Sequence, residues 1–251
     1  MQAYATTFPA TIEVDLIFPR NDTYAPTVLF PIVFAFQNPA LAPSLDPGFE
    51  LELFDISSPN LTAYSPTLDL AKTNFSGSNP MFVYTSITNL KAASYILAWE
   101  YSASNCTLNQ NISGSVNIGG ALRSNRVAFT IQSGVQVPDL TGGTTSCKNI
   151  TNFAFNLTDT LEVAVPAQYD GRNSCAVVSD SQALVAGNPC AVQVGSGTAS
   201  SISAALTATA CLAVTPVVSC RPTSAALRVR DTALTGYMFV LGGIAAAFAG
   251  M

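Results

Sequence analysis

Acidic residues stand two apart at two places in this chain, and paired carboxyl groups are what glycoside hydrolysis requires. Glu13 and Asp15 flank Val14, and Glu50 and Glu52 flank Leu51. A glycosidase needs two carboxyl groups held roughly 5–10 Å apart. Because each pair alternates with apolar residues, each lies on one face of a strand, and we expect that face to be a solvated sheet surface. A glycan-processing enzyme stays an alternative that requires two acids in one cleft.

The single tryptophan lies in an aromatic strand that has two interpretations. Tyr95, Leu97, Trp99 and Tyr101 alternate on one face, and Glu100 points the other way. A buried tryptophan is typical of a sandwich core, whereas an exposed one would form a platform for stacking sugars; we expect the core. Three tyrosines near turn residues are better placed for exposed contacts: Tyr24, Tyr64 and Tyr169.

The absence of histidine from all 251 residues removes several kinds of chemistry. Ser-His-Asp and Cys-His centres need an imidazole base, and most catalytic zinc sites need imidazole ligands. The sequence also contains no Gly-x-Ser-x-Gly elbow and no phosphate-binding glycine motif. We therefore assign no catalytic, cofactor-binding or metal-binding residue, and we expect a protein without catalysis.

Apolar periodicity predicts an all-β fold. The period is two, not 3.6, through most of the chain, and turn residues separate the apolar runs. This pattern favours an antiparallel β-sandwich of immunoglobulin-like architecture with a disulfide-containing C-terminal part. The clearest strands are 12–18, 49–53, 95–101, 127–131 and 153–157, and 198–210 is the one helical stretch.

One strand and one boundary need comment. Val28 to Phe36 is almost continuously apolar, which predicts a central strand, although Pro31 would need a bulge or an edge position there. We expect one β-rich ectodomain over 8–222, with an internal seam near 137–147, because five of the six cysteines lie at or after Cys147.

Seven asparagines lie in N-glycosylation sequons, where chance in this composition would give roughly three. Their spread over the first two thirds of the chain predicts a glycoprotein with glycans on many faces. The seven are Asn21, Asn60, Asn74, Asn105, Asn111, Asn149 and Asn156.

Six cysteines, an even number without a CxxC motif, predict disulfides formed in an oxidising compartment. Six cysteines allow 15 pairings, among which sequence cannot choose; Cys175 with Cys190 and Cys211 with Cys220 are plausible local loops. The full set is Cys106, Cys147, Cys175, Cys190, Cys211 and Cys220.

Residues 223–251 resemble the signal for a glycosylphosphatidylinositol (GPI) anchor. Such a signal has small residues at the cleavage site, a polar spacer and an apolar tail. Ser224-Ala225-Ala226 supply the small residues, 227–232 the spacer, and 233–251 an apolar run without charge, so Ser224 is the expected attachment residue. A single C-terminal membrane span and a buried helix are the alternatives. Residues 1–7 have no basic or apolar leader, so we expect the secretory leader to be missing from this chain.

Two blocks of sequence are similar to an uncharacterised family of secreted fungal proteins, defined as a domain of unknown function. They are Phe8–Pro26 and Leu29–Pro43, with further similarity around Asn188-Pro-Cys190 and over Cys211–Cys220. The resemblance implies a leader and a C-terminal anchor. It implies no activity.

Together these features predict a GPI-anchored, N-glycosylated protein on the outer leaflet of the plasma membrane or in the cell wall. A carbohydrate-binding or adhesion module, with wall polysaccharide as partner, is the main alternative. A net charge of −5, with few charged residues, argues against nucleic acid. No cofactor is expected, and oligomeric state is not predicted.

Overall fold

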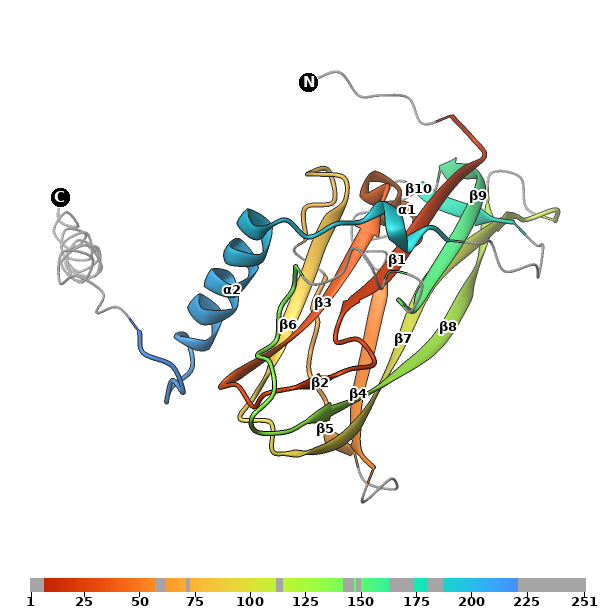
Figure 1. The fold of residues 1–251 in the computed structure, drawn as a ribbon. Helices are drawn as coiled ribbons and strands as arrows, with labels where there is room; N and C mark the ends of the chain where they lie inside the picture. Colours follow the sequence, from red (N-terminus) through yellow and green to blue (C-terminus); the bar gives the residue numbers. More distant parts are fainter. Residues whose placement is uncertain are drawn as a thin grey trace, which may run out of the picture.

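The computed structural model describes residues 7–56, 62–70, 73–111, 115–141, 147, 150–162, 174–179 and 187–220. Two five-stranded sheets pack face to face (Figure 1). The predicted antiparallel β-sandwich is confirmed, with β2 and β8 as a parallel pair. Sheet A runs β10(Ser174–Val178), β9(Asn152–Glu162), β1(Ala10–Phe18), β3(Leu29–Gln37), β6(Met81–Thr88), and sheet B runs β2(Thr23–Tyr24), β8(Val116–Ile131), β7(Ala93–Leu108), β4(Gly48–Asp55), β5(Thr62–Tyr64).

Strand β1 lies in the middle of sheet A between β3 and β9, and both pairings are antiparallel. Strand β3 is an interior strand between β1 and β6, which agrees with its apolar run. Pro31 is tolerated because β1 reaches only to Val33 on that side, so at Pro31 the strand pairs with β6 alone. Strand β1 precedes residues 137–147 and β9 follows them, and the two strands pair with each other in sheet A.

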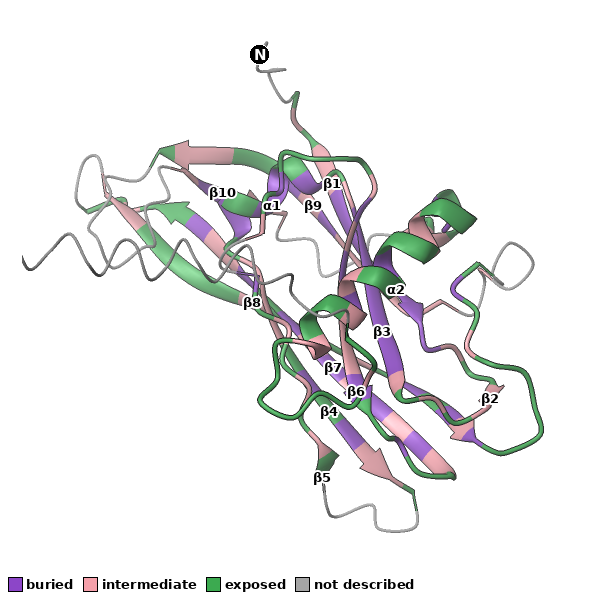
Figure 2. Ribbon diagram, turned by 90° about the vertical axis from the view of Figure 1, so that its left-hand side faces the viewer, coloured by how far each residue is buried: buried purple, intermediate pink, exposed green. Residues whose placement is uncertain are grey.

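Strands β7 and β8 form a hairpin of two 16-residue strands that dominates sheet B. The register runs without a shift from Ala93 opposite Ile131 to Leu108 opposite Val116. On the outer side of β8, the short β2 pairs with Thr130 and Ile131. Figure 2 shows that the half of β8 away from β2 is mostly exposed, in contrast to the buried β3.

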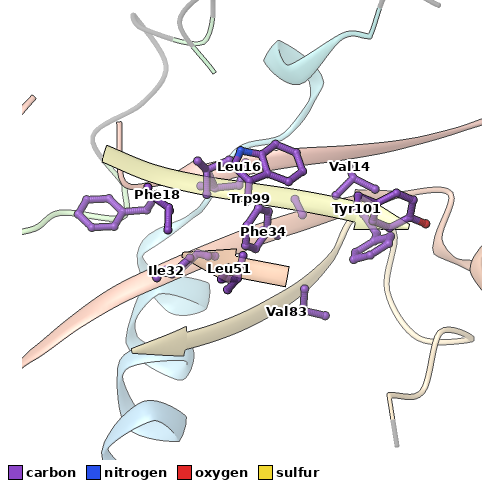
Figure 3. Packing of buried hydrophobic residues seen from close by; sticks show 14 of the residues in the cluster. Val14, Leu16, Phe18, Ile32, Phe34, Leu51, Val83, Trp99 and Tyr101 are labelled. Carbon is purple, nitrogen blue, oxygen red and sulfur yellow. The ribbon is translucent and has the colours of Figure 1, made fainter. Parts of the chain in front are cut away.

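The core between the sheets is aromatic (Figure 3). Trp99 is 1% exposed and lies edge-on to Phe34, with ring centroids 5.1 Å apart. Phe30 of sheet A stacks on Phe129 of sheet B at 5.0 Å. Such pairs contribute beyond their buried area, so alternating aromatic residues fix how the two sheets face each other.

The C-terminal segment covers the outer face of β1 and β3, so that these two strands of sheet A are buried on both sides. Val192 and Val194 are buried; they follow the 3-10 helix η4(Pro189–Ala191). Helix α2(Ser196–Ala210) then contacts β3 and β6, with Ile202 and Leu206 buried. This confirms the helix predicted at 198–210. A second 3-10 helix, η1(Pro39–Leu41), and the single turn α1(Ala42–Leu45) connect β3 to β4.

Candidate functional site

Glu13 and Asp15 lie on the outer face of β1, but this face is not solvated. Glu13 is 5% and Asp15 0% exposed, so the prediction of a solvated surface for this pair is wrong. The reason is the C-terminal segment, which crosses β1 at residues 187–194. The prediction is right for Glu50 and Glu52, which are exposed on β4, and Glu100 is half-buried on β7.

Glu13 is held by two donors from distant parts of the chain. Asn152 on β9 donates from Nδ2 to Oε1 at 2.8 Å. The backbone N–H of Asn188 donates to Oε2 at 2.7 Å. A Cβ atom at Gly187 would overlap the Glu13 carboxylate, so glycine is what lets the segment approach the strand so closely.

Asp15 is joined to the same segment through Gln37 of β3. The Gln37 Nε2 group donates to Asp15 Oδ2 at 3.0 Å and to the Asn188 carbonyl oxygen at 3.1 Å. The other carboxyl oxygen, Oδ1, is buried and receives no hydrogen bond from any described group. We call these five residues the carboxyl clasp: Glu13, Asp15, Gln37, Asn152 and Asn188.

The clasp holds a proton at neutral pH. Burial is the main cause that raises the pKa of Asp15 from its ordinary 3.8 to about 8; the hydrogen bond with Glu13 raises it as well, and the one from Gln37 lowers it. At neutral pH we therefore expect Asp15 to be protonated, which avoids a second negative charge beside Glu13 in a buried site. The clasp fastens the C-terminal segment, and none of the described cavities opens onto its two acids.

Two other acids line a cavity on a different part of the molecule. This cavity has a volume of about 720 Å³ and lies between α1, the start of β4, residues 68–70, Thr73 and Phe75. Asp46 and Asp69 line it together with Phe49 and Phe75, and no lysine or arginine is among its described lining residues. We call it the acidic cavity. Carboxylates beside aromatic rings are groups that bind polyhydroxylated or cationic ligands.

Sequence reasoning missed Asp46 and Asp69 because neither lies in a paired motif; the fold brings a turn and a loop together. A signal for the clasp did exist. Ile17 lies on the same face as Glu13 and Asp15, and an apolar residue on that face indicates cover, not water. Ile17 is in fact 2% exposed.

The prediction for Trp99 is confirmed, whereas the prediction for Tyr24 is wrong. Trp99 belongs to the core, as expected, and is packed against Phe34, Phe49 and Phe153. Tyr24, predicted to be exposed, is 4% exposed and lies against Phe18, because its hydroxyl group bonds the Arg20 backbone and the ring turns inward. Tyr64 is half-buried, and Tyr169 lies outside the described residues.

All six cysteines are paired. Cys106 binds Cys175, Cys147 binds Cys190, and Cys211 binds Cys220. The local loop at Cys211–Cys220 is confirmed. The predicted Cys175–Cys190 loop is wrong, because β10 lies against β7 and brings Cys175 to Cys106. Three disulfides indicate an extracellular or secreted protein.

The sequons differ in accessibility. Asn21, Asn74 and Asn111 are exposed, whereas Asn105 and Asn156 are half-buried in strands. The Asn105 side chain is engaged, since its Oδ1 accepts a hydrogen bond from the Val178 N–H at 2.9 Å. Asn60 and Asn149 lie outside the described residues, as do Ser224 and the predicted anchor signal at 223–251.

Across the described part of the chain, no helix has the length and apolar character to span a membrane. No curated protein and no solved structure matched the chain. A family model did: residues 7–220 match the domain of unknown function DUF7136, and the chain belongs to that family.

Proposed function

We propose that this chain is the ectodomain of a fungal cell-surface or cell-wall glycoprotein, displayed by a GPI anchor at Ser224 and without catalysis. The observation that carries the proposal is the set of three disulfides, one of which closes at Cys220, four residues before Ser224. A disulfide-bonded domain followed directly by a GPI-type signal is typical of a secreted protein that a lipid anchor holds at the cell surface.

Two further observations support display. Exposed sequons at Asn21, Asn74 and Asn111 leave room for glycans. The carboxyl clasp is sealed by residues 187 and 188, so Glu13 and Asp15 serve to fasten the chain; a substrate would need them exposed. In this role the lipid would hold the domain at the outer leaflet, and the glycans and disulfides would keep it soluble and folded.

Mass spectrometry of the mature C-terminus tests the proposal. The gene, expressed behind a secretory leader, is expected to yield a terminal Ser224 bearing an anchor remnant. A triple variant with leucine at positions 224–226 serves as control, because cleavage requires small residues, and it should lose the remnant. Peptides that extend to Met251 in the unaltered protein would contradict the anchor.

Carbohydrate binding is the second candidate, and the acidic cavity is the observation that favours it. Asp46 and Asp69 offer acceptors to sugar hydroxyl groups, beside Phe49 and Phe75. Binding to wall polysaccharides on a glycan array is expected to fall at least about tenfold in Asp69→Ala. Asp159→Ala, an exposed acid on β9 away from the cavity, is the matched control. An array without any bound glycan would remove this candidate.

A further inference from the structure

The outer edge of β8 is open over most of its length. Strand β2 pairs only with Thr130 and Ile131. Between Val116 and Phe129, none of the strands in the described ranges pairs with β8 on the side away from β7. An open edge presents unpaired N–H and C=O groups to any strand that can reach it.

The hydrogen bonds on both sides of β8 show which residues face this edge. Ser115 accepts from Asn109 at 2.9 Å on the β7 side, whereas Thr130 donates to Asp22 at 3.0 Å on the β2 side. In an antiparallel strand, residues alternate between the two sides, and the register with β7 has no shift. Odd-numbered residues therefore bond β7, and the even-numbered ones face outward: Val116, Ile118, Gly120, Leu122, Ser124, Arg126 and Ala128.

The two halves of this edge differ. Near β2 the edge is protected, because the Asn125 side chain accepts the Arg126 N–H at 2.8 Å and Arg126 adds a charge. Residues 116–122, Val-Asn-Ile-Gly-Gly-Ala-Leu, contain no charge and no proline. Charges and proline are the usual protection of an edge strand, so this half has the chemistry of a pairing surface.

The unprotected half is symmetric about one residue. Ile118 and Leu122 lie two positions before and after Gly120, and they are 37% and 56% exposed. A Cβ atom at Gly120 would meet nothing within 4 Å. We propose that two copies of this chain form a two-fold symmetric dimer by antiparallel pairing of β8 with β8, with Gly120 opposite Gly120 of the second copy.

This register satisfies both backbone and side chains. Ile118 of each copy lies opposite Leu122 of the other copy. The two-fold axis therefore repeats this apolar contact on both sides of Gly120. Arg123 lies opposite Asn117, so no arginine meets its counterpart. Pairing of 118, 120 and 122 forms about six ladder hydrogen bonds. The Leu122 carbonyl oxygen, which now accepts from Arg123 Nη1 at 3.0 Å, has a second lone pair for the incoming N–H.

The dimer is expected to be weak. Edge pairing over seven residues buries less area than a standard interface, which suggests a dissociation constant on the order of 1–100 µM. A second copy is a better occupant than an unrelated strand, because the apolar residues are self-complementary about a single glycine.

Sedimentation equilibrium across that concentration range tests the dimer. Ile118→Lys and Leu122→Lys each place like charges in the interface on both copies, and each should weaken dimerisation at least about tenfold. Leu108→Lys is the matched control: Leu108 is 67% exposed on β7 of the same hairpin and off the open edge. A monomer throughout the range, or a dimer that these two variants leave unchanged, would overturn the proposal.

A covalent trap tests the register itself. Opposed residues of a hydrogen-bonded antiparallel pair have Cα atoms about 5.5 Å apart, within the range that a disulfide spans. Gly120→Cys should therefore form a disulfide-linked dimer, and Ala128→Cys, exposed on the same strand but away from the symmetry centre, should not. Peptide mapping would verify that the three native disulfides remain. Equal cross-linking of both variants, or of neither, would contradict the register.

Discussion

The carboxylate of Glu13 accepts a 2.7 Å hydrogen bond from the backbone N–H of Asn188, 175 residues later in the chain. This bond joins the first strand of the sandwich to the segment that covers its outer face. The cover that it fastens buries β1 and β3 on both sides. Beyond Asn188 the chain continues into Val192, Val194 and α2, so the clasp is the point where this cover is fastened.

Gly187→Ala tests how tightly the segment must approach. The new Cβ atom would overlap the Glu13 carboxylate, so the segment must shift and strain the Asn188 bond. Overpacking of this kind costs about 1–3 kcal/mol in the free energy of unfolding, measured by urea denaturation. Gly197→Ala in α2 is the control: its Cβ meets nothing within 4 Å, and stability should rise by about 0.5–1 kcal/mol. Equal effects of the two substitutions would contradict the close approach.

Asp15 should make the protein less stable as pH rises. The pKa of Asp15 is 3.8 as an ordinary value and about 8 in the fold. Between those values the folded protein holds a proton that the unfolded chain has released. The free energy of unfolding therefore falls with increasing pH across this window, by up to about 1.4 kcal/mol per pH unit.

Asp15→Asn removes this titration but keeps a donor for Glu13. Urea unfolding at about pH 4.5 and 7.5 should show that the variant loses less stability between the two values than the unaltered protein. Glu52→Gln, the same kind of substitution on the exposed face of β4, is the matched control. A variant with the pH dependence of the unaltered protein would show that Asp15 is ionised in the fold.

The alternation of apolar and polar residues was enough to predict the strands and the sandwich, because each strand's own residues state its period. Trp99 could be assigned to the core for the same reason. What the alternation of β1 could not show is that residues 187–194 cross its polar face. That contact depends on a segment some 175 residues away, and only the apolar Ile17 on the same face indicates it.

The prediction that Cys175 pairs with Cys190 failed for a similar reason. Short spacing correctly pairs Cys211 with Cys220, where the loop is local. Cys175 lies nearer in sequence to Cys190 than to Cys106, yet sheet topology places β10 against β7. The acidic cavity likewise joins Asp46 in a turn to Asp69 in a loop, and no local pattern relates the two.

Loss of individual disulfides should scale with the loop that each closes. Cys106–Cys175 spans 69 residues and is buried, whereas Cys211–Cys220 spans 9. Chain entropy predicts a cost of about 4 kcal/mol for the first and about 3 for the second, and removing the first also leaves a gap beside Leu161. Replacing each pair by alanine and comparing thermal midpoints checks this. A larger loss from the exposed C-terminal loop would contradict the order.

Trp99→Ala separates a core tryptophan from a sugar platform. Because Trp99 is 1% exposed among three other rings, truncation should cost about 3–5 kcal/mol. Phe54→Ala, a half-buried ring on β4, should cost much less. A Trp99 variant of unchanged stability would place the indole at the surface, and sugar stacking would then have to be reconsidered.

Glycan occupancy should follow exposure of the sequons. Asn21, Asn74 and Asn111 are exposed, and at Asn74 the Ser76 hydroxyl already donates to the side-chain oxygen at 2.6 Å. Asn105 differs, because its side chain holds the Val178 N–H where β7 meets β10, next to Cys106–Cys175. A glycan there would separate the strands that this disulfide joins.

Glycopeptide mass spectrometry of the secreted protein should therefore find high occupancy at the three exposed sites and little at Asn105. Asn105→Gln should leave the glycan mass unchanged, whereas Asn74→Gln should remove one chain; high occupancy at Asn105 would mean that β10 docks on β7 without this contact.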